Sequence, residues 1–170
     1  MLRDAAPIAD AERVRQIYNH YVETNTATFE VEPIGEAVMA NRIAAVQAAD
    51  LPFLIFEDAD GVQGFAYAAP FHERAAYVHT VTCSVYVDPG AVGRGVGKVL
   101  YADLIRAVRE LDAGPHAPVR SIVALIALPN DASVALHEAV GFRHTGTIVD
   151  VGRKFGRWLD VGYWQLPLAH

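Results

Sequence analysis

The passage "AYVHTVTCSVYVDPGAVGRGVGK" (76–98) constrains the fold of this chain more than any other stretch. Apolar residues alternate up to Asp88, which predicts one long strand, and Pro89 with Gly90 ends it. From about Gly95 to Leu111 the apolar residues recur with helical spacing instead. A strand, a glycine-rich turn and a helix therefore follow one another directly, and this order predicts helices packed on a sheet.

The remaining sequence predicts three further helices and five further strands. The helices run from about Asp10, as N-cap, to Thr24, from about Gly35 to Ala49 with Val38, Ile43 and Val46 buried, and from Asn130 or Asp131 to Val140. The strands are "PFLIFED" (52–58), "VQGFAYAAP" (62–70), "SIVALIAL" (121–128), "HTGTIVDVG" (144–152) and "DVGYWQLPL" (160–168), and "ADG" joins the first two in a hairpin. This order predicts a single domain over residues 1–170, an α/β sandwich of helices around a mixed sheet.

The formal net charge of −6 argues against nucleic acid as a partner, because phosphate backbones are held by accumulated Lys and Arg. Basic residues do gather locally, in "GRGVGK" and "GRKFGRW", which suits a small anionic ligand. No apolar run approaches the ~18 residues of a membrane helix, and the N-terminus does not resemble a secretory signal. The single cysteine fits a reducing compartment. We therefore expect a cytoplasmic protein without a membrane or nucleic-acid partner.

The glycine-rich turn "VGRGVGK" (92–98) has the chemistry of an anion cradle. It offers successive backbone amides with few side chains in the way, at the N-terminus of the predicted helix. A dinucleotide fingerprint that began at Gly93 would need glycine at Lys98, and a P-loop would need glycine at Val92 and a hydroxyl at Val99. The turn is therefore either a different kind of phosphate cradle or a tight turn that binds nothing.

Four stretches resemble a known family. "SVYVDPGAVGRGVGKVLY" resembles the coenzyme A loop of the GNAT superfamily of N-acyltransferases, with Val92 where the family has Gln or Arg and with Gly95 and Gly97 in the glycine places. "LPNDASVALHEAVGF" resembles the next motif of that superfamily. "IYNHYVETNTATFEVEP" and "VGRKFGRWLDVGYWQLPL" are similar to its phosphinothricin and methionine-sulfone acetyltransferase subgroup. Together the stretches span nearly the whole chain.

The resemblance implies a mostly antiparallel mixed sheet flanked by helices, and a homodimer. It also implies transfer of acetyl from acetyl-CoA to the amine of a small amino-acid-like substrate by direct attack, without a metal. The residues that it implies for coenzyme binding are Val85, Tyr86, Val87, Gly93, Arg94, Gly95, Val96, Gly97, Lys98, Asn130 and Ser133. The backbone N–H near Val85 would polarise the thioester carbonyl. Asn130 would cap its helix, contact the pantetheine arm, or do both.

The catalytic groups are less clear from the sequence. Cys83 falls on the more apolar face of its predicted strand and is interpreted as packing. Thr82 stands where the subgroup carries a glutamate taken as the general base, and threonine cannot accept a proton near neutral pH. His79, three residues earlier, is either a substitute base or a structural histidine. His137 occupies the place of a family thiolate-protonating residue, or lies at the edge of a packed stripe.

For the acceptor amine, the subgroup-like stretches suggest Phe29, Arg74, Tyr77, Thr80 and Lys154. Arg74 or Lys154 would supply charge for a substrate carboxylate, although either is more often a surface residue. Because of Thr82, a non-catalytic acyl-CoA-binding protein stays an alternative. An acetyltransferase for a polyamine, an aminoglycoside or a peptide N-terminus is another.

Overall fold

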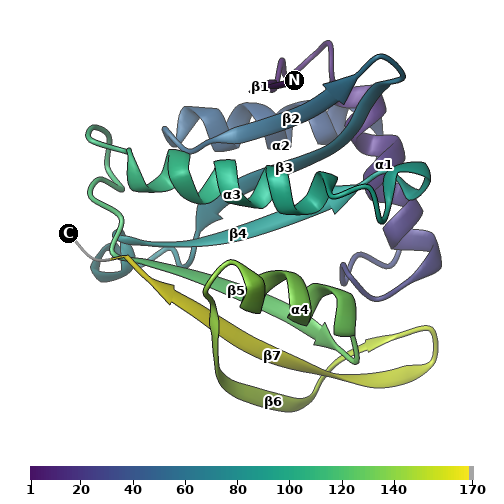
Figure 1. Cartoon of the computed structure of the whole chain (residues 1–170). Helices are drawn as coiled ribbons and strands as arrows, with labels where there is room; N and C mark the ends of the chain where they lie inside the picture. The colour runs from purple at the N-terminus through teal and green to yellow at the C-terminus, as the bar shows by residue number, and fades with distance from the viewer. Residues whose placement is uncertain (169–170) are drawn as a thin grey trace.

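Seven strands form one sheet in the computed structural model, which describes residues 1–168 (Figure 1). The strands are β1 (Leu2–Asp4), β2 (Phe53–Asp58), β3 (Gly61–Pro70), β4 (Thr80–Val87), β5 (Ser121–Leu128), β6 (Arg143–Lys154) and β7 (Arg157–Pro167). Their order in the sheet is β1-β2-β3-β4-β5-β7-β6. Every neighbouring pair among these described strands is antiparallel except β4 with β5. This confirms the predicted fold class, a mixed and mostly antiparallel sheet.

Four helices cover the two faces of the sheet: α1 (Ala11–Thr24), α2 (Glu36–Ala48), α3 (Val96–Arg109) and α4 (Asp131–Ala139). Figure 1 shows α3 and α4 on one face and α1 and α2 on the other. Two buried clusters result, and β4 contributes to both, with Cys83 in the cluster under α3 and Tyr86 in the cluster under α1. None of the described helices combines the length and the apolar character needed to cross a membrane.

Helix details depart from the predictions at two places. Val38 is 45% exposed, and Met39 takes its place in the core with Ile43, because Met39 and Ile43 lie one turn apart on the face toward the sheet. Asp10 stands at the N-cap position of α1 without capping the helix. Its carboxylate instead accepts hydrogen bonds from the Arg3 guanidinium and from the backbone N–H of Ala6, 2.7 Å away. The predicted cap at Asn130 is confirmed, since its side chain accepts from the N–H of Ser133 at 3.1 Å.

The prediction of one long strand from residue 76 is wrong. β4 begins only at Thr80, and Ala75–Tyr77 form a single 3₁₀ turn. The reason is the lack of ladder partners: β3 ends at Pro70, and β5 begins level with Thr80. Without a neighbouring strand the segment curls, and the Tyr77 ring packs against the rings of Phe71 and His72 instead.

The sheet splits in its middle. β4 pairs with β5 only from Thr80 to Thr82, opposite residues 121–123. β4 remains paired with β3 along its whole length, and β5 remains paired with β7 from Ser121 to Leu128. The two central strands therefore diverge beyond Thr82, as Figure 1 shows, and leave a wedge-shaped gap.

Candidate active site

The β4 side of the gap presents unpaired backbone. In an antiparallel ladder, successive residues direct their N–H and C=O alternately to one neighbour and to the other. The carbonyl of Thr80 accepts from Phe71, and the N–H of Asp88 donates to Gln63, so even-numbered residues of β4 face β3. Odd-numbered residues face β5, and beyond Thr82 that side is the gap. The N–H and C=O of Val85 therefore point into the gap, which is the position predicted for an oxyanion donor.

One mouth of the gap opens on the glycine-rich turn. Gly93 and Gly95 have φ values of +83° and +82°, which side chains rarely tolerate, and Gly95 directly precedes α3. A hollow of about 450 Å³ lies against these amides. The residues predicted for the coenzyme that line it are Val85, Val87, Gly93, Gly95, Val96, Gly97, Lys98, Asn130 and Ser133. The amides of α3's first turn and the Lys98 side chain suit phosphate groups.

Two predicted coenzyme residues do not line this hollow. Arg94 is half-exposed and pairs with the Asp58 carboxylate at 3.0 Å. Tyr86 turns its ring to the opposite face of the sheet, among the rings of Tyr18, Tyr21 and Phe65. Tyr21 also lines the hollow and was not among the predicted residues. Its hydroxyl donates to the Val87 carbonyl at 2.6 Å. Tyr21 lies in the helix predicted from Asp10 to Thr24, to which the sequence assigned no binding role.

His137 lies where the gap passes through the sheet. This passage is lined from β4 by Cys83 to Tyr86, from β5 by Leu125 to Ala127, and from α4 by Asn130, Ser133 and His137. His137 is buried, and its Nδ1 lies 2.7 Å from the carbonyl of Ser133. Because a carbonyl only accepts, Nδ1 carries the proton and Nε2 keeps its lone pair. Burial lowers the pKa of His137, and the bond to Ser133 opposes this in part, so the imidazole is neutral at pH 7.

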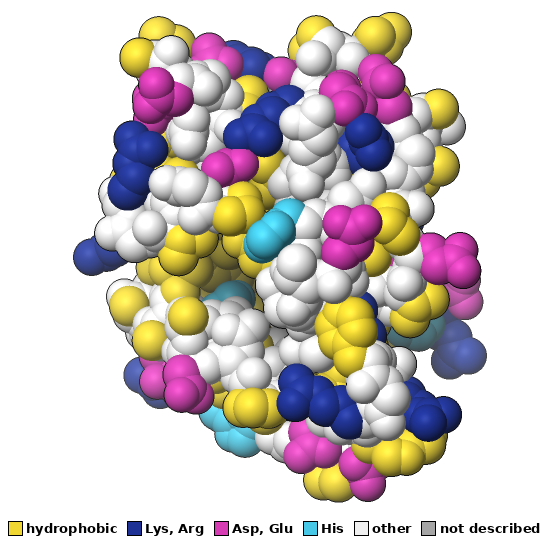
Figure 2. All heavy atoms as spheres, turned by 90° about the vertical axis from the view of Figure 1, so that its right-hand side faces the viewer, with side chains coloured by type: hydrophobic (Ala, Val, Ile, Leu, Met, Phe, Trp, Pro, Cys, Tyr) yellow, Lys and Arg dark blue, Asp and Glu magenta, His cyan; other side chains and the backbone are white. Residues whose placement is uncertain are grey.

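A third hollow, the acceptor pocket, lies on the other face of the sheet and has a volume of about 430 Å³. Its walls come from the loop between α1 and α2 and from β5, β6 and β7, and it shares Ala27, Tyr86, Leu125 and Ala127 with the passage beside His137. Figure 2 looks onto the open end of the gap and shows a hollow there, with hydrophobic side chains around and inside it. The gap thus joins an anion cradle on one face to a mainly apolar pocket on the other.

Titratable groups are scarce along this path. No Asp or Glu is among the described residues that line the cradle, the passage or the acceptor pocket. Thr82 stands at the apex of the gap, on the same face as the acceptor pocket, and its hydroxyl donates to the Ala69 carbonyl at 3.3 Å. Cys83 is buried as predicted, and burial raises the pKa of its thiol, so a thiolate nucleophile is disfavoured. Among the described residues that line these three spaces, His137 is left as the one whose neutral side chain can take up a proton at pH 7.

The other residues predicted from the sequence gather at the closed end of β4. Arg74 and Tyr77 are exposed in the connection from β3, Thr80 pairs with Ser121, and His79 precedes the strand, with its ring near the carbonyl of His116. At ~3.3 Å per residue, His79 is roughly 20 Å along the chain from Val85. The structure does not bring His79 to the gap, so the interpretation of His79 as a base three residues up the same strand is not supported.

Lys154 fixes the loop that walls the acceptor pocket. Its side chain is buried, and its Nζ donates to the carbonyls of Asn25 and Thr28 at 2.8 Å and of Tyr21 at 3.5 Å. An ammonium has three protons, and these three carbonyls use them all. Burial lowers the pKa of Lys154. Lys154 therefore holds the loop in place in this chain, whereas the sequence offered Arg74 or Lys154 as the charge for a substrate carboxylate.

Phe29 docks the same loop on β6. A Cβ built on Gly152 would lie 2.1 Å from the Phe29 ring, which means that the ring covers the bare backbone of that glycine. Phe29 lines the acceptor pocket from this position. Its predicted place beside the substrate therefore depends on a glycine in the strand that faces it.

Gly152→Ala is expected to displace Phe29 and to lower the stability by about 1–3 kcal/mol, the usual cost of overpacking. Thermal unfolding measures the loss, and the KM for the acceptor amine should rise with it. Gly146→Ala is the matched control, because a Cβ at Gly146 in the same strand meets nothing within 4 Å. Equal effects from the two variants would show that alanine is destabilising at any glycine of β6. The contact between Phe29 and Gly152 would then not explain the loss.

The fold and the gap define a class of protein. A glycine-rich anion cradle, a split sheet with free strand backbone and a pocket behind the split suit an enzyme that moves a group from a long anionic donor to an acceptor held on the opposite face. A family model described as "Acetyltransferase (GNAT) domain" matches residues 4–162. The chain therefore belongs to the GNAT acetyltransferase family, as the sequence motifs predicted.

Individual relatives agree with this assignment. The chain is 39% identical to a phosphinothricin N-acetyltransferase of Alcaligenes faecalis over 94% of its own length and 78% of the relative's. It is 36% identical to an L-methionine sulfoximine/L-methionine sulfone acetyltransferase of Salmonella typhimurium, over 94% and 90%. A GNAT superfamily phosphinothricin acetyltransferase from Sinorhizobium meliloti, crystallised with acetyl-CoA, superposes with a TM-score of 0.90 at 37% identity, over 99% and 88% of the two chains.

Proposed function

We propose that this protein transfers an acetyl group from acetyl-CoA to the primary amine of a small amino-acid-like substrate. The observation that carries the proposal is the gap between β4 and β5, because it joins the cradle at Gly93–Lys98 to the acceptor pocket through one passage. A pyrophosphate would lie on the cradle amides, and a pantetheine arm has the amides and carbonyls to pair with β4 along the gap. The names of the relatives point to phosphinothricin or methionine sulfone as the type of amine.

The Val85 N–H is suited to polarise the thioester carbonyl, because it points into the gap from a strand that the ladder with β3 holds rigid. The amine must first lose a proton. Nε2 of His137 has a free lone pair in the passage and takes this proton directly or through one water. The amine then attacks the thioester carbon, and the tetrahedral intermediate loses its second N–H proton to solvent. The C–S bond breaks to give the amide, and the thiolate takes the proton held on Nε2 and leaves as the coenzyme A thiol, so one proton is released overall.

We also propose that the chain acts as a homodimer in the cytoplasm. The support for a dimer is a group of exposed apolar side chains on β6, β7 and the turn between them, namely Ile148, Val149, Val151, Phe155 and Trp158. Side chains of this size and number on one hairpin are typical of a surface that another chain covers. Light scattering is expected to give about twice the mass of the 18.4 kDa chain, and a monomer would contradict the dimer.

Acetyl-CoA is expected to raise the unfolding temperature of the protein, because a ligand that binds only the folded state adds about 2.7 kcal/mol at one hundred times its Kd. Gly95→Val serves as the matched variant. A Cβ at Gly95 meets nothing within 4 Å, and the φ of +82° disfavours a β-branched residue, so valine should distort the left-handed backbone of the cradle. The shift should shrink in this variant, and an unshifted wild type at saturating acetyl-CoA would overturn the proposed function.

Because Thr82 replaces the expected glutamate, an alternative function is that of a protein that binds acyl-CoA without catalysis. Release of the coenzyme A thiol with methionine sulfone or phosphinothricin as acceptor separates the two functions. We expect measurable but modest turnover. A thermal shift without thiol release from any amine would favour the binding protein.

A further inference from the structure

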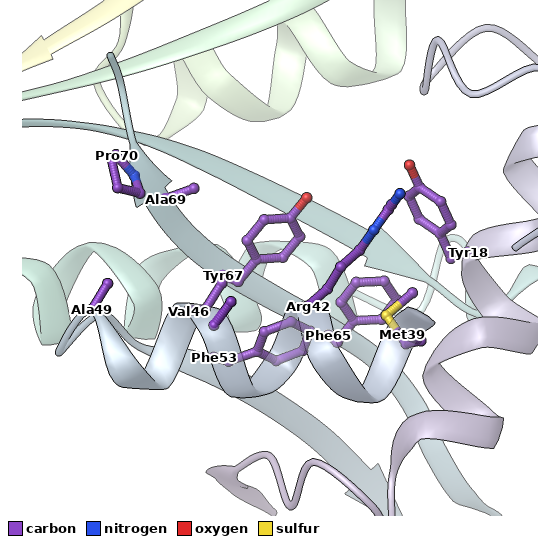
Figure 3. A pocket seen from close by; sticks show the side chains of 11 residues that line it. Tyr18, Met39, Arg42, Val46, Ala49, Phe53, Phe65, Tyr67, Ala69 and Pro70 are labelled. Atoms are coloured by element: carbon purple, nitrogen blue, oxygen red, sulfur yellow. The ribbon is translucent and has the colours of Figure 1, made fainter. Parts of the chain in front are cut away.

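A fourth hollow lies beside the acceptor pocket, between α2 and the sheet (Figure 3). Its volume is about 400 Å³, which is within the range of small-molecule sites. α2 approaches β2 and β3 from one side with Met39 and Val46, and the rings of Phe53, Phe65 and Tyr67 form the opposite wall. These three rings stack at centroid distances of 5.2 to 6.4 Å, so this wall is a continuous aromatic stack. Tyr67 is its most exposed ring, because Phe53 and Phe65 are buried.

This side hollow meets the acceptor pocket. Tyr18 and Tyr67 line both spaces. Tyr67 also lies directly opposite Ser84 in the β3–β4 ladder, and Ser84 lines the passage where the amine would react. Neighbouring strands are ~4.8 Å apart, so a substrate whose amine lies at the gap reaches the aromatic wall with a side chain that crosses one strand spacing.

The walls of the side hollow are uncharged except at Arg42. Nη2 of Arg42 lies 2.6 Å from the Glu30 carboxylate, and the guanidinium sits over the Tyr18 ring at 5.7 Å. Its charge is thus already compensated at the rim. A phosphinate or sulfone would lose hydration among these rings with few partners in return, whereas an aliphatic or aromatic side chain would gain from leaving water.

The inner end of the side hollow lies next to Thr82. Ala69, which lines this end, is the ladder partner of Thr82, and both point to the face of the sheet that α2 covers. A glutamate at this position would place a carboxylate beside the hollow, and threonine leaves that end uncharged. The aromatic wall and the missing carboxylate are independent observations that favour the same kind of occupant.

We infer that the acceptor carries an aliphatic or aromatic side chain that occupies this hollow. The substrates are then apolar α-amino acids and related apolar primary amines, in preference to phosphinothricin. The inference rests on the proposed acetyl transfer and narrows its substrate class. It assigns the side hollow to substrate selection.

Thiol release with phenylalanine, leucine, alanine, methionine sulfone and phosphinothricin as acceptors tests the inference. We expect kcat/KM for phenylalanine and leucine to exceed that for phosphinothricin at least tenfold. Ala45 lines the hollow from α2, so Ala45→Phe should fill it and lower kcat/KM for phenylalanine about tenfold, with less than a twofold change for alanine. Ala44→Phe is the matched control, because Ala44 is exposed like Ala45 but is not part of the lining.

The possible outcomes separate the inference from the proposed function. Phosphinothricin as the best acceptor, or an equal loss for every amine in Ala45→Phe, would overturn the inference and leave acetyl transfer intact. Absence of turnover with every amine would overturn both. Ala69→Val narrows the hollow from the sheet and should repeat the selective loss, so the result does not depend on how α2 accepts a phenylalanine. The thermal shift with acetyl-CoA reports that each variant is folded.

Discussion

His137→Gln is expected to lower kcat about 10²- to 10³-fold, the range in which positioned acid–base groups contribute. Glutamine approximates the shape of the side chain and can still donate to the Ser133 carbonyl, but it cannot accept a proton. His137 is the one histidine among the described residues along the path from the cradle to the acceptor pocket. Steady-state thiol release measures the loss, and the thermal shift with acetyl-CoA should persist.

The pH profile gives a readout that a merely structural role would not change. Because burial lowers the pKa of His137, the imidazole stays neutral down to a pH below its ordinary value of 6.5, and activity should fall only below that pH. This acid limb should be absent from the residual activity of His137→Gln.

His79→Ala is the control for that profile, and its acid limb should be unchanged, since His79 lies at the closed end of β4. If His79→Ala removed the limb and His137→Gln kept it, His79 would be the base and the assignment to His137 would be wrong.

The stability of the fold should depend on pH in the same direction as the activity. The unfolded chain takes up a proton on His137 near pH 6.5, whereas the folded chain does so only at lower pH, so folding stability falls as the pH drops through this window. His137→Gln should weaken that dependence. The comparison is made by thermal unfolding on both sides of pH 6.5, without any substrate present.

The cradle and the order of elements could be predicted from the sequence because their causes are local. Glycines at 93 and 95 have the positive φ values that only glycine adopts readily, and the change from alternating to helical spacing marks where β4 gives way to α3. Asn130 was predicted as a cap for the same reason, since its partner Ser133 is three residues away. Features whose interacting residues lie within a few positions of each other in the sequence were predicted correctly.

The features that sequence reasoning missed depend on partners far along the chain. The three carbonyls that hold Lys154 are about 130 residues away, and nothing near Lys154 indicates that its charge is already used. Gly152 was placed only in a predicted strand, yet it makes room for Phe29. The segment before Thr80 has the alternation of a strand, but its neighbours end too early to pair with it. Alternation predicts a strand only where a ladder partner exists.

Thr82→Glu is expected to raise kcat/KM about tenfold. Thr82 is the last residue of β4 that pairs with β5, and its side chain lies on the face of the acceptor pocket. A carboxylate there would hold the ammonium of the acceptor and take its proton beside the gap, the task that we propose for His137 in the passage. If His137 acts as the base, as proposed, the gain should stay at the low end of what such groups contribute. Thiol release with alanine as acceptor, whose methyl group does not reach the side hollow, measures the gain.

Thr82→Gln separates the charge of the new side chain from its size. Glutamine has nearly the same volume as glutamate and cannot act as a base, so it should give no gain and should hinder an acceptor whose side chain passes Ala69. A gain with glutamine equal to that with glutamate would mean that threonine is merely too small, and the idea of a missing base would be wrong. An inert wild type made active by glutamate alone would show that the chain keeps the cradle and the pocket of an acetyltransferase but lacks only the group that deprotonates the amine.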